Sequence, residues 1–162
     1  MFTINEILDI AVRLEKNSEA VYRQALDKVL DKVSNPDLAA ALAWIAEEEV
    51  LHAQWFENLK DSAHARLEKI PPEGLDSNFL KTIIGEQSFS LEDVNFSDIQ
   101  QLSELLDIFI ESEKDGILFY QMLQPFIRNE NTRTMLKSII AEEKRHIQTM
   151  QEFVATPPAP IN

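Results

Sequence analysis

The chain has 162 residues, of which 44% are hydrophobic and 27% charged, a composition typical of one compact domain. It contains no Cys, which excludes disulfides, iron–sulfur clusters, zinc fingers and thiol nucleophiles. Its formal net charge of −13 disfavours nucleic acid and anionic membranes as partners and favours cations. Because the sequence has neither a signal-like N-terminal segment nor an apolar run long enough to cross a bilayer, we expect a cytoplasmic protein.

Long segments with helical periodicity and only three Gly predict an all-α protein. The first helix is expected over residues 4–33, opened at Thr3 by a capping-box pattern. A break at Asn35 and Pro36 precedes the second helix, whose apolar stripe runs over residues 38–67.

The second half of the chain is expected to repeat this arrangement after a long connection at residues 71–96, in which a short helix is expected around residues 78–84. The third helix is expected to begin at Ser97 and to end or kink at Pro125. The fourth helix is expected over residues 132–154.

Two helix pairs joined by one long crossover predict a four-helix bundle. Residues 1–155 form the predicted domain, and residues 156–162 form a proline-rich C-terminal tail that cannot continue the last helix. The crossover is long enough for helix pairs to exchange between chains, so we expect a homodimer.

Four motifs recur between the two halves of the chain. The recurring residues are Glu15 with Tyr22, Glu49 with His52, Glu113 with Tyr120, and Glu143 with His146. The offset is 98 residues between the first and third helices (113 − 15) and 94 between the second and fourth (143 − 49). The difference falls in the turns within the pairs, where length changes are tolerated, so the pattern indicates an internal duplication.

In each helix the repeated residues interrupt an apolar stripe that otherwise faces the core. Glu and His three residues apart point to the same side of a helix. Because a buried, unpaired carboxylate is costly, we expect cations among these side chains. Four carboxylates and two imidazoles are the ligand set of di-iron carboxylate bundles, in which two divalent cations neutralise the carboxylates. Oxygen ligands with one nitrogen per metal favour iron or manganese, although zinc can compete.

Several neighbouring residues admit more than one interpretation. Glu48 and Glu142 are also repeated, but they lie beside the stripe and are expected to be solvated. Tyr22 and Tyr120 stand about 10 Å along the helix from the preceding Glu, where a phenol either hydrogen-bonds a carboxylate or fills the core.

Two further pairs of residues bear on the surroundings of the site. Ser18 and Gly116, each one turn after a repeated Glu, either leave space for dioxygen or peroxide or permit close helix packing. Trp44 and Trp55 are interpreted as packing or interface residues.

Together these motifs resemble the rubrerythrin-type, ferritin-like superfamily of di-iron proteins, in the form without a rubredoxin domain, over residues 4–154. The resemblance implies a ferritin-like bundle with two iron ions per chain. The implied ligands are bridging Glu49 and Glu143, terminal Glu15 and Glu113, and one histidine per iron, His52 and His146. The implied catalytic residues, which donate hydrogen bonds beside the metals, are Tyr22 and Tyr120.

The chain departs from the rubrerythrin pattern in two places. Rubrerythrins carry a further Glu one turn before the ligand of the third helix, linked to a redox-dependent ligand exchange, and this chain has Ile110 there. They also carry a rubredoxin iron site, which a chain without Cys cannot form. Any reductant must therefore be a separate electron donor.

The sequence is compatible with three functions. The first is a di-iron oxidoreductase that reduces peroxide or dioxygen or oxidises ferrous iron. The second is a non-catalytic module that binds and handles iron. The third is a metal-free structural bundle, which the repeated set of six polar core residues disfavours.

Overall fold

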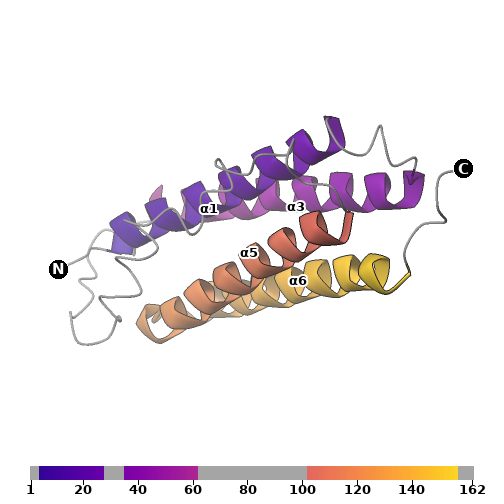
Figure 1. Ribbon diagram of the computed structural model, residues 1–162. Helices are drawn as coiled ribbons and strands as arrows, with labels where there is room; N and C mark the ends of the chain where they lie inside the picture. The colour runs from indigo at the N-terminus through magenta and orange to yellow at the C-terminus, as the bar shows by residue number, and fades with distance from the viewer. Residues whose placement is uncertain (1–3, 28–34, 62–101, 157–162) are drawn as a thin grey trace, which may run out of the picture. The chain divides into compact units, whose positions relative to one another are not determined.

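Helices account for almost all of the residues that the computed structural model describes, which are 4–27, 35–61 and 102–156 (Figure 1). The elements are α1 (Ile4–Ala25), α3 (Pro36–Asp61), α5 (Leu102–Leu123), the 3-10 helix η3 (Gln124–Phe126) and α6 (Glu130–Ala155). No strand occurs within these ranges, so the prediction of an all-α fold is confirmed. None of the described helices is both long and apolar enough to cross a membrane.

Several sequence-based expectations fall outside the described residues. They are the capping boxes at Thr3 and Ser97, the helix ends at residues 28–33 and 62–67, the connection at 71–96 with its short helix, and most of the proline-rich tail. The assignment of residues 1–155 to a single domain also stays a prediction.

The start of α3 follows from Asn35 and Pro36, the predicted break. The side-chain Oδ1 of Asn35 accepts a hydrogen bond from the backbone N–H of Leu38 at 3.0 Å. Pro36 occupies the first helical position, where its missing N–H leaves no hydrogen bond unmade. A side-chain cap and a proline thus set the first residue of this helix.

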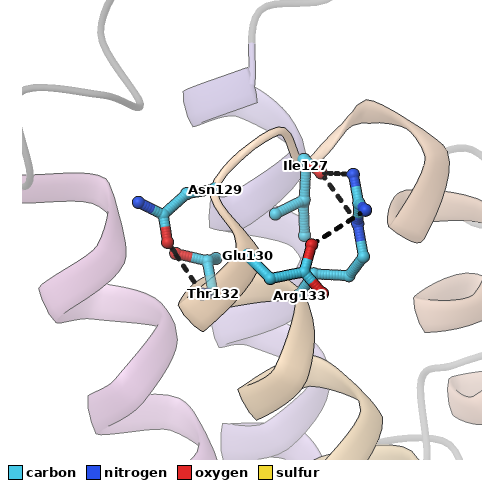
Figure 2. Close-up of polar contacts among 5 residues, drawn as sticks. All are labelled: Ile127, Asn129, Glu130, Thr132 and Arg133. Atoms are coloured by element: carbon cyan, nitrogen blue, oxygen red, sulfur yellow. Dashed lines mark hydrogen bonds and ion pairs between the residues drawn. The ribbon is translucent and has the colours of Figure 1, made fainter.

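The helix α5 ends close to Pro125, as predicted: its last residue is Leu123, and Pro125 is the second residue of η3, which follows directly. The fourth helix starts two residues earlier than expected, at Glu130 rather than Thr132. Asn129 is its N-cap and accepts a hydrogen bond from the backbone N–H of Thr132 at 3.0 Å (Figure 2). A cap preceding the first apolar position by several residues accounts for the difference.

Arg133 ties the same turn to the first turn of α6 (Figure 2). Its guanidinium donates two hydrogen bonds to the carbonyl oxygen of Ile127, at 2.8 and 3.2 Å. It also pairs with the carboxylate of Glu130 at 3.1 Å. Since Ile127 is 6% exposed, one charged side chain satisfies the carbonyl of a buried turn residue.

The chain divides into two compact units, and both α1 and α3 contribute to each. Unit 1 comprises Met1–Tyr22 with Ile45–Val94, and unit 2 comprises Arg23–Trp44 with Asn95–Asn162. In unit 2, α5 and α6 pack side by side and run in opposite directions from the short turn that joins them (Figure 1).

In unit 1, α1 and α3 are likewise antiparallel. Lys16 in the middle of α1 pairs with Glu57 of α3 at 2.6 Å. Asp9, earlier in α1, pairs with Lys60, later in α3. Contacts that progress in opposite directions along the two helices require opposite chain directions. Both pairs are partly exposed, so they orient the helices more than they stabilise them.

The four helices bury the apolar stripes that their periodicity predicts. Side chains with exposures of 0–1% include Leu8, Leu42, Ile45, Phe56, Leu106, Phe109, Leu136 and Ile139. The described residues with buried polar or charged side chains interrupt these stripes, and they are the six that the duplicated motifs supply: Glu15, Glu49, His52, Glu113, Glu143 and His146.

Candidate metal centre

Each of the six candidate ligands is 5% exposed or less. Their repeated neighbours Glu48 and Glu142 are only half-buried, in line with the interpretation that they are solvated. The hydrophobic stripe therefore orients one carboxylate of each adjacent pair inward and leaves the other near solvent. The six buried residues form one triad in unit 1 and one in unit 2.

The first triad consists of Glu15 from α1 with Glu49 and His52 from α3, all in unit 1. Each residue offers one ligand atom, and these atoms lie within 4.8 Å of one another. His52 Nδ1 is 3.5 Å from Glu15 Oε2. Glu49 and His52 are one helical turn apart, so α3 supplies two donors from one face and α1 supplies the third.

The second triad has the same composition in unit 2: Glu113 from α5 with Glu143 and His146 from α6. Their ligand atoms also lie within 4.8 Å of one another. His146 Nδ1 is 3.0 Å from Glu143 Oε2 and 3.8 Å from Glu113 Oε1. The imidazole thus directs its Nδ1 atom toward both carboxylates.

Burial and charge change the proton equilibria of the second triad. Burial, together with the nearby charge of Glu143, raises the pKa of Glu113 to about 8. Burial alone lowers the pKa of His146, but hydrogen bonds to Glu113 and Glu143 outweigh it and raise this pKa to about 10. Without a metal, the triad therefore retains protons near neutral pH that partly neutralise its carboxylates.

The donors present fit a divalent cation of the iron or manganese class. Each triad offers carboxylate oxygens and one imidazole nitrogen, close enough together to bind one ion. In the second triad, the proton retained on His146 partly neutralises the carboxylate charge, and a bound cation would neutralise the same charge. A purely structural core has no use for three converging ionisable groups in each helix pair.

Tyr22 and Tyr120, the predicted catalytic tyrosines, are both buried, with 1% exposure. Their positions on α1 and α5 are two turns beyond Glu15 and Glu113. Beside Tyr120 lies Gly116, where an added Cβ would stand 3.9 Å from the ring atom Cε2. The hydrogen-bonding role that the resemblance implies for these tyrosines stays a prediction.

Trp44 and Arg145 contact the second triad or its neighbour, and their connection to it was not predicted. Trp44 was interpreted as a packing or interface residue, whereas its ring lies against that of His146 at 5.3 Å between centroids. The guanidinium of Arg145 lies over the ring of Trp44. Neither residue recurs in the duplication, so the repeated pattern indicates neither of them.

Helices that bury clusters of carboxylates and imidazoles are typical of the ferritin-like class of helical proteins. A crystal structure of a protein from Thermotoga maritima described as a ferritin-like diiron-carboxylate protein is similar, with a TM-score of 0.66, 25% identity and 95% of each chain covered. The chain belongs to the rubrerythrin family, whose family model matches residues 6–154. No curated protein matches the sequence. The predicted ferritin-like bundle and the rubrerythrin resemblance are thereby confirmed.

Proposed function

We propose that this chain is a di-iron oxidoreductase whose two triads bind two iron ions. The observation that carries the proposal is the duplicated, fully buried donor set: each unit holds two carboxylates and one imidazole with ligand atoms within 4.8 Å. Membership of the rubrerythrin family and similarity to a protein described as a diiron-carboxylate protein support iron over the other metals that such donors accept.

In the proposed site, the ligands, the surrounding apolar side chains and the tyrosines have different roles. The carboxylates and imidazoles of the triads bind metal, and ligation replaces the protons that the metal-free second triad holds on Glu113 and His146. The surrounding apolar side chains exclude water and hold the ligands in place. Tyr22 and Tyr120 are assigned as hydrogen-bond donors beside the ligands. Bound iron would supply redox chemistry and Lewis acidity toward dioxygen or peroxide.

The electron supply and the ligand set restrict which reactions the chain can catalyse. The chain has no Cys, so the electrons for peroxide or dioxygen reduction come from a separate donor or from ferrous iron as substrate. Ile110, which is buried, stands where rubrerythrins with ligand exchange carry a Glu. We therefore propose a reaction in which the ligand set stays the same between oxidation states.

A second candidate function is a non-catalytic module that binds and handles iron. The same two observations favour it: Ile110 cannot serve as an alternative ligand, and the chain carries no electron-donating iron site of its own. This function requires metal affinity from the triads but no acceleration of oxygen chemistry.

Metal content decides whether either iron function holds. Protein purified without chelators is expected to contain about two irons per chain, and the double variant His52→Ala, His146→Ala close to none. Zinc or manganese in place of iron would retain the site and contradict the redox assignment. Metal-free wild-type protein, as stable as the variant, would contradict both functions.

Peroxide consumption then separates the enzyme from the module. Ferrous-loaded protein is expected to consume peroxide at least tenfold faster than the same concentration of free ferrous iron. Glu143→Ala should abolish the acceleration, and Glu142→Ala, which changes the partly exposed neighbour, should not. Equal rates with and without protein would leave the iron-handling function.

We also propose that the protein is a homodimer. The support is the sequence argument that the long crossover lets helix pairs exchange between chains. Light scattering coupled to size-exclusion chromatography should give twice the mass of the 18.6 kDa chain.

A further inference from the structure

Trp44, which is half-buried, is in contact with a candidate metal ligand. Its ring lies at 88° to the imidazole of His146, with 5.3 Å between the centroids. This edge-to-face geometry is the preferred arrangement of two rings. Because His146 is fully buried, the contact restricts rotation of a side chain that has no solvent on any side.

Arg145, next to His146 in the chain, fixes the other partner of this contact. Its guanidinium carbon lies 5.0 Å from the centroid of the Trp44 ring, within the range of a cation–π interaction. Arg145 is exposed, Trp44 is half-buried and His146 is buried. The three side chains, all in unit 2, therefore form a series of contacts from the surface to the second triad.

The duplication does not repeat the residues of this series. The offset of 94 residues (143 − 49) pairs Trp44 with Ser138 and Arg145 with Leu51. Ser138 and Leu51 are both exposed, and serine and leucine can form neither an aromatic nor a cation–π contact. The ligands are duplicated between the two halves, whereas Trp44 and Arg145 have no counterparts at the matching positions.

The ring of His146 is thus held by two kinds of contact. On its Nδ1 side, the carboxylates of Glu143 and Glu113 lie at 3.0 and 3.8 Å. Trp44 contacts the ring independently of these carboxylates. A ligand whose ring is already oriented loses less conformational freedom when a metal binds, so its affinity rises.

We propose that Trp44, held by Arg145, is a positioning residue for His146, and that it raises the metal affinity of the second triad. The inference deepens the proposed iron-binding function and depends on it. Its consequence is that loss of the Trp44 ring weakens metal binding at the second triad.

Equilibrium dialysis against ferrous iron under anaerobic conditions tests the proposal. Trp44→Ala should weaken one of two bound equivalents about tenfold and leave the other unchanged, in line with the effect of residues that orient metal ligands. Trp44→Phe, which retains a ring, should lose about threefold or less. In a His146→Ala background, Trp44→Ala should have no further effect on the remaining equivalent.

Trp55→Ala is the matched control. Trp55 lies on the same helix, is also half-buried and packs edge-to-face on Phe56 at 4.9 Å. It should cost fold stability similar to that lost with Trp44 and leave both iron equivalents in place. Arg145→Leu, which introduces the residue found at the matching place in α3, alters an exposed side chain and should give a few-fold loss without unfolding the protein.

A readout without metal checks the contact itself. In the wild-type protein the ring protons of His146 should show a ring-current shift in the NMR spectrum that disappears in Trp44→Ala and persists in Trp55→Ala. Two irons bound as tightly in Trp44→Ala as in wild type, or equal weakening by Trp55→Ala, would overturn the inference alone. Wild-type protein that binds no iron would overturn the proposed function together with it.

Discussion

Glu113 and His146 both hold protons in the folded, metal-free protein at pH values where the unfolded chain releases them. The pKa of Glu113 rises from 4.5 to about 8 through burial and the charge of Glu143. The pKa of His146 rises from 6.5 to about 10 because its carboxylate partners outweigh burial. Since the folded state binds more protons than the unfolded state between these limits, the free energy of unfolding must fall as pH rises.

The metal-free protein is therefore expected to be more stable at about pH 5 than at about pH 9. Chemical denaturation in the presence of a chelator, measured at intervals across this range, gives the profile. Glu113→Gln removes the ionisable group, so it should flatten the profile and stabilise the protein near pH 9, where the wild-type carboxylate is ionised in a buried site beside Glu143. The same variant should bind iron more weakly, because it lacks one carboxylate.

A rise in stability with pH, or a Glu113→Gln profile parallel to that of the wild type, would contradict this account. The comparison also separates the triad from the general charge of the chain. The net charge of −13 destabilises the compact state at high pH in both proteins alike. Only the difference between the two profiles reports on Glu113.

Gly116 gives a second prediction at the residue scale. Gly inside a helix costs about 1 kcal/mol relative to Ala. Among the residues that the structure describes, a Cβ at this position would meet only Tyr120, at an ordinary contact distance of 3.9 Å. Close packing therefore does not require the glycine. Gly116→Ala is expected to raise the free energy of unfolding by about 0.5–1 kcal/mol, measured by thermal and chemical denaturation.

The outcome bears on the two interpretations of Gly116. A stabilised variant with unchanged peroxide kinetics would show that the position is neither a packing constraint nor an access route. A stabilised variant that reacts more slowly, with both irons bound, would show that the space beside Glu113 admits the oxidant. Loss of stability would contradict the geometry at Tyr120.

At the scale of the element, caps and breakers determine where the helices begin and end. Pro125 ends α5 as the sequence predicts, and Asn35 with Pro36 starts α3. The start of α6 was predicted at Thr132 and lies at Glu130, because Asn129 is the cap. Periodicity locates the apolar face of a helix but says little about its polar first turn, which depends on hydrogen bonds.

Asn129→Ala should destabilise the protein by about 1 kcal/mol, because it removes the acceptor for the N–H and the hydroxyl of Thr132, at 3.0 and 3.2 Å. Urea denaturation measures the loss. Asn129→Asp, which retains the acceptor, is the control and should lose a few tenths of a kcal/mol or less. Equal losses in the two variants would mean that the amide group, and not its oxygen, stabilises the turn.

At the scale of the whole molecule, the sequence predicted the fold and the burial of the six polar residues because both are encoded by repetition. Six polar residues at fixed offsets within apolar stripes indicate a duplicated helix pair in which both copies bury the same kinds of polar side chain. Trp44 and Arg145 were not connected to the site because they occur once, and no periodicity predicts which side chain of another helix a ring will meet. Contacts that occur only once in a duplicated protein become visible only in its three-dimensional structure.

Metal binding should couple the triads to the stability of the whole fold. Ions that bind only the folded state stabilise it by about 2.7 kcal/mol at a free concentration one hundred times Kd. For a chain of this size, about 2–4 °C per kcal/mol predicts a rise in Tm of roughly 5–10 °C with anaerobic ferrous iron. The shift should be larger at about pH 8 than at about pH 6, because fewer protons must be displaced from Glu113 and His146.

Differential scanning calorimetry with and without a chelator measures this coupling, and His52→Ala with His146→Ala provides the control. The metal-free double variant should unfold below the Tm of the metal-free wild type, because it loses the protonated imidazole that pairs with Glu113 and Glu143, and it should not respond to iron. A shift of equal size in wild type and variant would place the binding at exposed carboxylates, which an acidic chain has in number. A shift confined to the wild type means that the polar residues buried in the core are stabilised by the metal that they bind.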